Sequence, residues 1–191
     1  MLAFQLDHAR ARDAVHLPFE AAAVSAQLAA AGHEVIGIHS DAESRAVYLR
    51  RPDRGRRLSA ESRQLLEQRA AAHDEVYDVV FVVADGLSAL ATHRHAAPLL
   101  IAAAATLSGM GWRVAPVVVA SQARVALADE VGQLLRAEQA AILLGERPGL
   151  SVADSPGIYL TSGPRPGRSD AERNCISNIH GQGLSYAAAQ A

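Results

Sequence analysis

Two segments in the last third of the chain hold residue types that could contact a ligand. The first, residues 143–150, reads Leu-Leu-Gly-Glu-Arg-Pro-Gly-Leu and overlaps an apolar run, residues 140–144, typical of a buried strand. Ligands of open α/β sheets bind beyond the carboxyl ends of strands, so Glu146 lies where a ligand contact is expected. Its carboxylate could accept hydrogen bonds from amide or hydroxyl groups, or it could pair with Arg147 or cap a helix.

The second segment, residues 172–180, reads Glu-Arg-Asn-Cys-Ile-Ser-Asn-Ile-His and carries the single cysteine of the chain. A lone cysteine is most often a small buried apolar side chain. Cys175 could instead be a nucleophile with His180 as its base, which would make the chain a hydrolase. No acid stands at a recognised spacing to orient the imidazole, so this alternative is the weaker one.

Two further positions follow predicted strands. Val125 comes after a strand that ends near Ala120, where a branched apolar side chain could contact a flat ligand or simply join the core. Asp85 and Gly86 follow another strand and resemble a weak nucleotide-binding turn. The Gly-x-Gly-x-x-Gly and Gly-Lys-Ser/Thr motifs are absent, which disfavours a nucleotide-binding module. We expect Asp85 to cap a helix or to lie at the edge of a ligand site.

Metal and nucleic-acid sites are not indicated. His93 and His95 have no cysteine or carboxylate at ligand spacing, so no structural zinc site is expected. The basic segment 50–57 lacks interleaved aromatic residues, and a formal net charge of −2 gives no electrostatic reason for nucleic acid to bind. We expect this segment to be a solvated face or a contact with a partner subunit.

Composition sets further bounds on the 191 residues. There is no lysine, which excludes a lysine Schiff base. One cysteine allows no intrachain disulfide and fits a reducing compartment. No apolar run reaches the roughly 20 residues of a membrane span, and residues 1–16 do not read as a signal peptide. We therefore expect a cytoplasmic protein with no membrane partner.

The helices and strands that must position these residues are predicted from the periodicity of apolar residues and from residues that start or end helices. From residue 78 onward strands alternate with helices, which predicts an α/β fold with a parallel, doubly wound, Rossmann-like sheet at residues 78–191. Residues 1–77 are predicted to form a smaller, mainly helical region with a short hairpin at 34–39 and 45–49. The expected helices are 19–32, 59–73, 89–109 and 127–136, and the expected further strands are 78–84, 113–120, 140–144 and 158–161.

Several segments, taken in order, resemble one known family. These are residues 4–16, 48–58, 84–88, 143–150 and 172–180. Together they resemble the small (light) subunit of ethanolamine ammonia-lyase, an adenosylcobalamin-dependent enzyme. Each segment alone is weakly specific, but their ordered combination along nearly the whole chain is specific.

The resemblance implies a function in which ethanolamine is converted to acetaldehyde and ammonia by radical chemistry. It implies that Val125, Glu146 and Cys175 contact the cofactor, with Cys175 serving close packing rather than redox chemistry. The substrate would lie in the large subunit, so no catalytic residue is expected on this chain. The Asp-x-His-x-x-Gly signature is absent, so cobalamin would keep its own benzimidazole on cobalt.

The resemblance also implies a hetero-oligomer with the large subunit, and it adds a bacterial microcompartment as a second candidate location. The loops 85–90, 146–150 and 175–180, together with Val125, would line an apolar concave patch facing the partner, with segment 50–57 as a polar rim. Residues 185–191 read as the first turns of a helix that family members continue, so we expect a chain shortened at this end.

Overall fold

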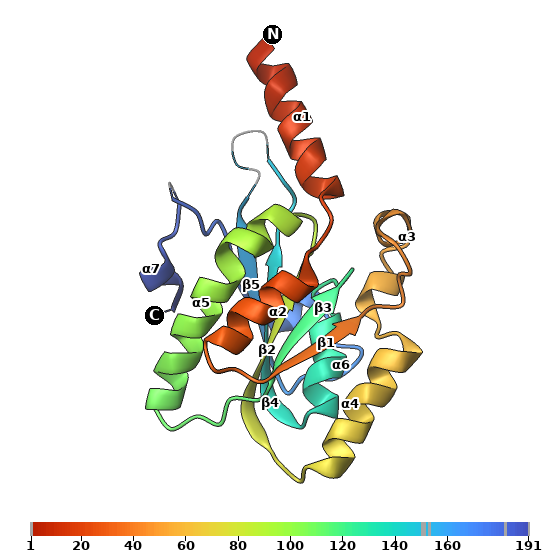
Figure 1. Ribbon diagram of the computed structural model, residues 1–191, viewed down its shortest axis with the longest axis vertical. Coiled ribbons are helices and arrows are strands. Elements are labelled where there is room, and N and C mark those ends of the chain that lie inside the picture. Colours follow the sequence, from red (N-terminus) through yellow and green to blue (C-terminus); the bar gives the residue numbers. More distant parts are fainter. Residues whose placement is uncertain (1, 150–151, 153, 182, 191) are drawn as a thin grey trace.

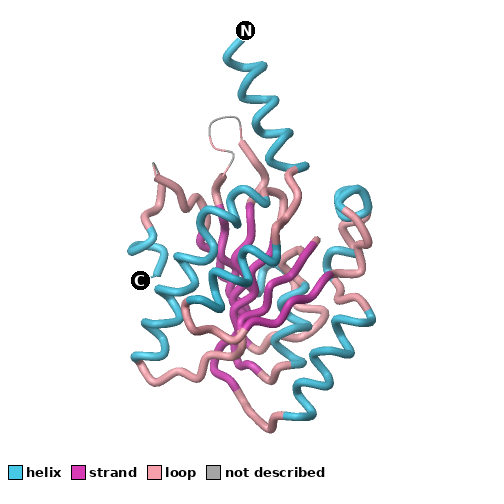
Figure 2. The backbone as a smooth tube through the Cα atoms, viewed as in Figure 1, coloured by secondary structure: helices cyan, strands magenta, loops and turns pink. Residues whose placement is uncertain are grey.

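A six-stranded mixed sheet forms the centre of the computed structural model, which describes residues 2–149, 152, 154–181 and 183–190 (Figures 1 and 2). The strand order is β1-β3-β2-β4-β5-β6. The first four of these are mutually parallel, whereas β5 and β6 run antiparallel to their neighbours. The strands are β1 Val35–His39, β2 Tyr77–Ala84, β3 Val117–Ser121, β4 Ala137–Gly145, β5 Pro156–Ser162 and β6 Arg173–Ile176.

Helices cover both faces of the sheet (Figure 1). One face packs against α2 Ala21–Ala30, α5 Ala89–Gly109 and α7 Tyr186–Gln190. The other face packs against α4 Ala60–Ala72 and α6 Leu127–Leu134. The helix α1 Leu2–His16 extends away from the sheet in Figure 1, and the short helix α3 Arg45–Arg50 follows β1. Two 3-10 turns complete the set, Arg54–Arg56 and Asp170–Glu172.

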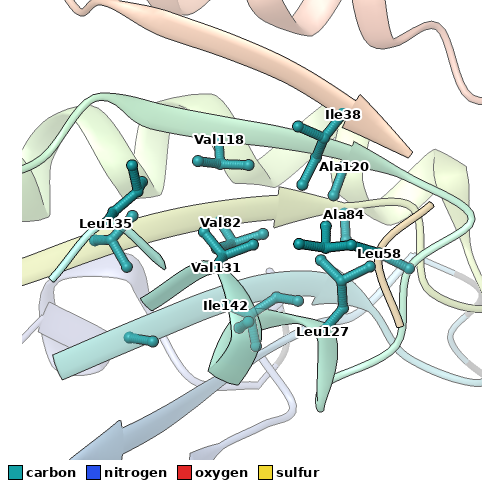
Figure 3. Packing of buried hydrophobic residues seen from close by; sticks show 14 of the residues in the cluster. Ile38, Leu58, Val82, Ala84, Val118, Ala120, Leu127, Val131, Leu135 and Ile142 are labelled. Atoms are coloured by element: carbon teal, nitrogen blue, oxygen red, sulfur yellow. The ribbon is translucent and has the colours of Figure 1, made fainter. Parts of the chain in front are cut away.

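Alternation along β2 shows how the two cores form. Successive side chains of a strand point to opposite faces, so Val80 and Val82 pack toward α4 and α6 while Phe81 and Val83 pack toward α2 and α5. Figure 3 shows the first of these cores, with Val82 lying among side chains of β3, β4 and α6. A strand covered on both faces must be apolar throughout, which is why residues 78–84 read as a continuous apolar run.

The predicted α/β class is confirmed, but the purely parallel sheet is wrong. The strands β5 and β6 are antiparallel to their neighbours, and only ten residues separate β4 from β5 (146–155) and β5 from β6 (163–172). A parallel crossover needs about a dozen residues or more, usually including a helix, and these connections are shorter. The doubly wound, Rossmann-like description is therefore not confirmed for this mixed sheet.

The predicted hairpin at 34–39 and 45–49 is also wrong. Residues 45–50 form α3, whose N-terminus is capped by the Ser44 hydroxyl as it accepts a hydrogen bond from the Val47 amide. The helix turns Tyr48 into the protein interior, and β1 pairs in parallel with β3 instead. The division of the chain at residue 77 stays a prediction, although β1 belongs to the same sheet as the later strands.

Candidate functional site

Two adjoining hollows lie at the carboxyl ends of the parallel strands, with volumes of about 390 Å³ and about 270 Å³. They share three lining residues, Arg124, Val125 and Tyr159. The remaining residues of the first hollow are Tyr48, Gly86, Leu87, Leu144, Gly145, Glu146 and Arg147. Those of the second are Arg56, Ala126, Asp170, Arg173 and Cys175. We refer to the two together as the edge cleft.

The structure brings the three predicted site residues to this cleft. Glu146 directly follows β4 and lines the first hollow, Cys175 lies on β6 and lines the second, and Val125 lines both. Strand register accounts for the meeting, because Tyr159 on β5 pairs with Cys175 on β6 and with Ile142 on β4. Their role in binding a cofactor stays a prediction.

Tyr159 connects the two predicted residues on either side of it. Its hydroxyl donates a hydrogen bond to Glu146 Oε1 at 3.3 Å. Burial raises the pKa of Tyr159, and the neighbouring Cys175 and Glu146 raise it further. Cys175 is an exposed residue, contrary to the usual burial of a lone cysteine, and the partial desolvation of its thiol raises the pKa of that group. At neutral pH this part of the cleft therefore presents a neutral phenol and a neutral thiol beside one carboxylate.

Asp85 holds the loops of the cleft together rather than capping a helix. Its side chain is 1 % exposed, with Oδ1 accepting from the Ala123 amide at 3.1 Å and Oδ2 accepting from Arg45 Nη1 at 3.0 Å. The cap of α5 is Ser88, whose hydroxyl accepts from the Ala91 amide, so the predicted capping role of Asp85 is wrong. Burial raises the pKa of Asp85 to about 6, and the charge of Arg45 partly offsets this rise.

Tyr48 is a cleft residue that the sequence did not indicate. Two guanidinium groups flank its ring, with the Cζ atoms of Arg45 and Arg124 at 4.8 Å and 4.5 Å from the ring centroid. Its hydroxyl donates to the Ala123 carbonyl oxygen, while Arg124 Nη2 donates to the Tyr48 carbonyl oxygen at 3.2 Å. These contacts fix the position of Arg124 at the boundary between the two hollows.

A buried ion pair anchors β6, and with it Cys175, to the rest of the fold. Arg173 and Asp129 on α6 form two hydrogen bonds, of 2.5 Å and 2.7 Å, with both side chains nearly inaccessible to solvent. Arg173 Nη1 also donates to the Thr161 hydroxyl of β5 at 2.7 Å. A bidentate guanidinium–carboxylate pair fixes both distance and orientation.

The alternative pairing of Cys175 with His180 gains no support. His180 lines a different hollow, of about 710 Å³, together with residues of α1 and α5, and its Nε2 lies 2.7 Å from Asn178 Oδ1. The raised pKa of Cys175 also disfavours a reactive thiolate. Leu150, which closes the first predicted segment, lies outside the described residues.

The lining of the edge cleft is mixed rather than apolar, contrary to the expected patch. A more apolar hollow, about 500 Å³, lies on the sheet face that α5 covers, and Phe81, Leu143 and Ile158 are among its lining residues. Arg56, from the segment expected to be a polar rim, lines the second hollow of the edge cleft itself.

Neither of two other features occurs in the part of the chain that the structure describes. No helix there is long and apolar enough to cross a membrane. No group of three or more histidine, cysteine, aspartate or glutamate side chains is placed there to hold a metal ion.

Comparison with known proteins gives a consistent family. The model of the ethanolamine ammonia-lyase light chain family (EutC) matches residues 1–191. The ethanolamine ammonia-lyase small subunit of Ralstonia nicotianae is 58% identical over 188 residues, which cover 98% of this chain and 70% of the relative. The small subunits of Pseudomonas syringae pv. tomato and Xanthomonas campestris pv. campestris are 57% and 54% identical, with 98% of this chain and 66% and 69% of the relatives covered.

Proposed function

This chain belongs to the ethanolamine ammonia-lyase light chain family, and we propose that it is the small subunit of a lyase that converts ethanolamine to acetaldehyde and ammonia. In this proposal the chain acts in a complex with a large subunit and covers one side of adenosylcobalamin at the interface between the two. The family match carries the reaction, and the meeting of Val125, Glu146 and Cys175 at the edge cleft supports the cofactor contact.

The chemistry of the cleft fits such a cofactor. Cobalamin presents neutral amide arms around a flat ring, and Glu146 can accept hydrogen bonds from these amides while Tyr159 holds one of its oxygens. Val125 offers an apolar surface to the ring, and the small Cys175 side chain permits a close approach. The Nε of Arg124 is buried and has no hydrogen-bond partner among the described residues, as expected of a group that binds a ligand.

The residues that line the cleft indicate which roles belong to the protein and which to the cofactor. When bound, adenosylcobalamin supplies the radical chemistry, and the protein binds, orients and shields it. The thiol of Cys175 is held neutral, and Glu146 is engaged by Tyr159, so we assign neither a role as nucleophile or base. The absence of the Asp-x-His-x-x-Gly signature supports the benzimidazole-on form of the cofactor.

The proposal includes the location and the partner. We place the substrate in the large subunit and the complex in the cytoplasm or in a bacterial microcompartment. Isolation of microcompartments from ethanolamine-grown cells, followed by detection of both subunits, distinguishes the two locations.

Removal of the Glu146 carboxylate tests the cofactor contact. In the complex with the large subunit, Glu146→Ala should weaken adenosylcobalamin binding by about 1–3 kcal/mol, roughly 5- to 150-fold in Kd, because buried amide donors of the cofactor lose their acceptor. An absorbance titration measures the Kd. Glu138→Ala, on the exposed start of the same strand, is the matched control.

The outcomes of this experiment are separable. If Glu146→Ala binds the cofactor as tightly as the unchanged complex does, the contact is wrong. If the unchanged complex does not bind adenosylcobalamin at all, the proposed function is wrong.

A further inference from the structure

The second hollow of the edge cleft carries positive charge that the protein does not neutralise. Arg56 and Arg124 both line it, and neither forms an ion pair within the described residues. Its third arginine, Arg173, is paired with Asp129 and also lies 3.4 Å from the Asp170 carboxylate. Asp170 also lines this hollow, so Asp129 and Asp170 together offset Arg173 and part of the remaining charge; the net positive charge left by Arg56 and Arg124 favours an anionic group.

The first hollow differs from the second in the position of its carboxylate. It holds the Glu146 carboxylate, and the neighbouring Arg147 offers the opposite charge. Arg124 stands at the boundary and lines both hollows. The Glu146 carboxylate of the first hollow repels an anion, whereas Arg124 and Arg56 both line the second hollow, where Asp170 lies beside Arg173. The anionic group of an elongated ligand is therefore expected toward the second hollow.

The position of Arg124 is fixed by several contacts, and its guanidinium can still donate to a further hydrogen-bond acceptor. Its backbone amide donates to the Gly55 carbonyl oxygen at 2.8 Å, which fixes the loop beside the turn that carries Arg56. Its guanidinium lies over the Tyr48 ring and donates from Nη2 to the Tyr48 carbonyl oxygen. Its Nε is buried and donates to no described atom, and a buried donor left unpaired is costly. A ligand oxygen beside Nε would remove that cost.

The proposed cofactor contains one group of the required kind. The amide arms of cobalamin are neutral, whereas its nucleotide tail is joined through a phosphodiester that carries a negative charge. Guanidinium groups bind phosphate oxygens through paired, charge-assisted hydrogen bonds. We propose that Arg124, assisted by Arg56, binds the phosphodiester of the nucleotide tail, so that the tail lies toward the second hollow and the amide arms toward Glu146. This inference rests on the proposed function.

Three ligands separate a phosphate contact from a contact with the ring. Adenosylcobalamin has the complete tail, adenosylcobinamide phosphate keeps a phosphate without ribose or base, and adenosylcobinamide lacks the phosphate. Their Kd values are measured by absorbance titration for the complex of this chain with the large subunit. Arg124→Gln should weaken the two phosphate-bearing ligands by about 10- to 100-fold and leave adenosylcobinamide unchanged.

Further variants guard against a merely structural effect. Arg124→Lys should recover part of the lost affinity, because lysine supplies the charge without the planar fork. Arg56→Gln changes an exposed side chain, so the fold does not depend on it, and it should show the same ligand pattern more weakly. Arg57→Gln removes a charge from the adjacent residue, which lines neither hollow, and should leave all three affinities unchanged.

Two results would overturn the inference. An equal loss for all three ligands in Arg124→Gln would show that Arg124 supports the ring or the fold rather than the phosphate. Unchanged affinity for all three would show that it makes no contact. An unchanged complex that fails to bind adenosylcobalamin would instead overturn the proposed function, whereas tight binding that is indifferent to Arg124 would overturn only this inference.

Discussion

Asp85 is a buried residue beside the edge cleft, and it lines neither of the two hollows. It joins the end of β2 to the loop after β3 and to α3 through the Ala123 amide and Arg45. The next two residues, Gly86 and Leu87, do line the first hollow. The position of the cleft loops therefore depends on a charged group that need not touch a ligand.

Asp85→Asn should destabilise the fold. Asparagine keeps only one of the two side-chain oxygens, so either the Ala123 amide or Arg45 loses its buried acceptor. We expect the free energy of unfolding to fall by about 1–3 kcal/mol near pH 4.5 and by less at neutral pH, measured by urea denaturation. Asp53→Asn, at an exposed ion pair with Arg51, is a control that should leave the free energy of unfolding nearly unchanged.

The same variant predicts a pH dependence with a definite sign. Burial raises the pKa of Asp85 to about 6, from an ordinary value of 3.8, so the folded chain binds more protons than the unfolded chain between these values. The stability contributed by protonated Asp85 is fully present below about pH 4 and is lost as the pH rises through about 6. The stability difference between the unchanged chain and Asp85→Asn should therefore shrink from about pH 4.5 to about pH 7.5. Denaturation curves that differ by a constant amount across this range would contradict the raised pKa.

Sequence reasoning located some cleft residues and missed others for a physical reason. Glu146 and Val125 could be found because each follows an apolar run, and the carboxyl ends of parallel strands meet at one edge. Cys175 came from the family resemblance. Tyr159 was missed because its place beside Glu146 depends on the pairing register of β4 and β5, which the spacing of residues in one strand does not reveal. Arg124 is adjacent to Val125 in the sequence and could have been found from the same loop.

Between elements, the end of β4 approaches the start of α5 at Gly145. A Cβ atom at this position would lie 1.9 Å from the Ser88 carbonyl oxygen, which is backbone and cannot rotate away. Gly145→Ala should therefore displace the end of β4 and with it Glu146. We expect a loss of at least about 2 kcal/mol in unfolding free energy and weaker cofactor binding by the complex.

Gly37→Ala in β1 is the matched control for this variant. A Cβ atom there meets no heavy atom within 4 Å, and the substitution should leave stability within about 1 kcal/mol of the unchanged chain. Thermal unfolding of the two variants compares them directly. Equal stability of Gly145→Ala and Gly37→Ala would show that the approach of β4 to α5 is not as close as described.

The ion pair that anchors β6 to α6 gives a second prediction about contacts between elements. Arg173→Met leaves the Asp129 carboxylate buried without its partner and should cost about 3–5 kcal/mol of unfolding free energy. The double variant Arg173→Met with Asp129→Leu removes both charges and should recover a large part of that loss. Urea denaturation of the single and double variants measures the recovery. A double variant no more stable than Arg173→Met alone would contradict the account of β6 as held by this ion pair.

The elements themselves were predicted unevenly. The helix predicted at 89–109 is confirmed as α5, and the apolar run at 78–84 is confirmed within β2, because long periodic or continuous apolar segments carry a strong signal. Residues 45–49 combine Val47, Tyr48 and Leu49 in a run short enough to read as a strand. The Ser44 cap and the burial of Tyr48 between two guanidinium groups favour a helix here. The burial of Tyr48 is a tertiary contact, which local sequence patterns do not reveal.

At the scale of the whole molecule, the antiparallel pair β5 and β6 is part of the edge cleft. It extends the carboxyl edge beyond β4 and places Tyr159 and Cys175 beside the loops that follow β3 and β4. A crossover helix between β4 and β5 would have reversed the direction of β5. The sequence did not reveal the direction of β5, because the predicted strands 140–144 and 158–161 leave about thirteen residues between them, enough for a crossover, whereas the observed connection 146–155 is shorter.

The last prediction concerns the dependence of activity on a partner. The edge cleft supplies hydrogen-bond acceptors, guanidinium groups and a neutral thiol, but within the described residues it holds no nucleophile with a base and an orienting acid. Purified chain mixed with ethanolamine and adenosylcobalamin should therefore release no ammonia. Titrating the chain into a fixed amount of the large subunit should raise ammonia release to a plateau, as complex formation saturates. Ammonia release by the pure chain would contradict the prediction, as would full activity of the large subunit without it.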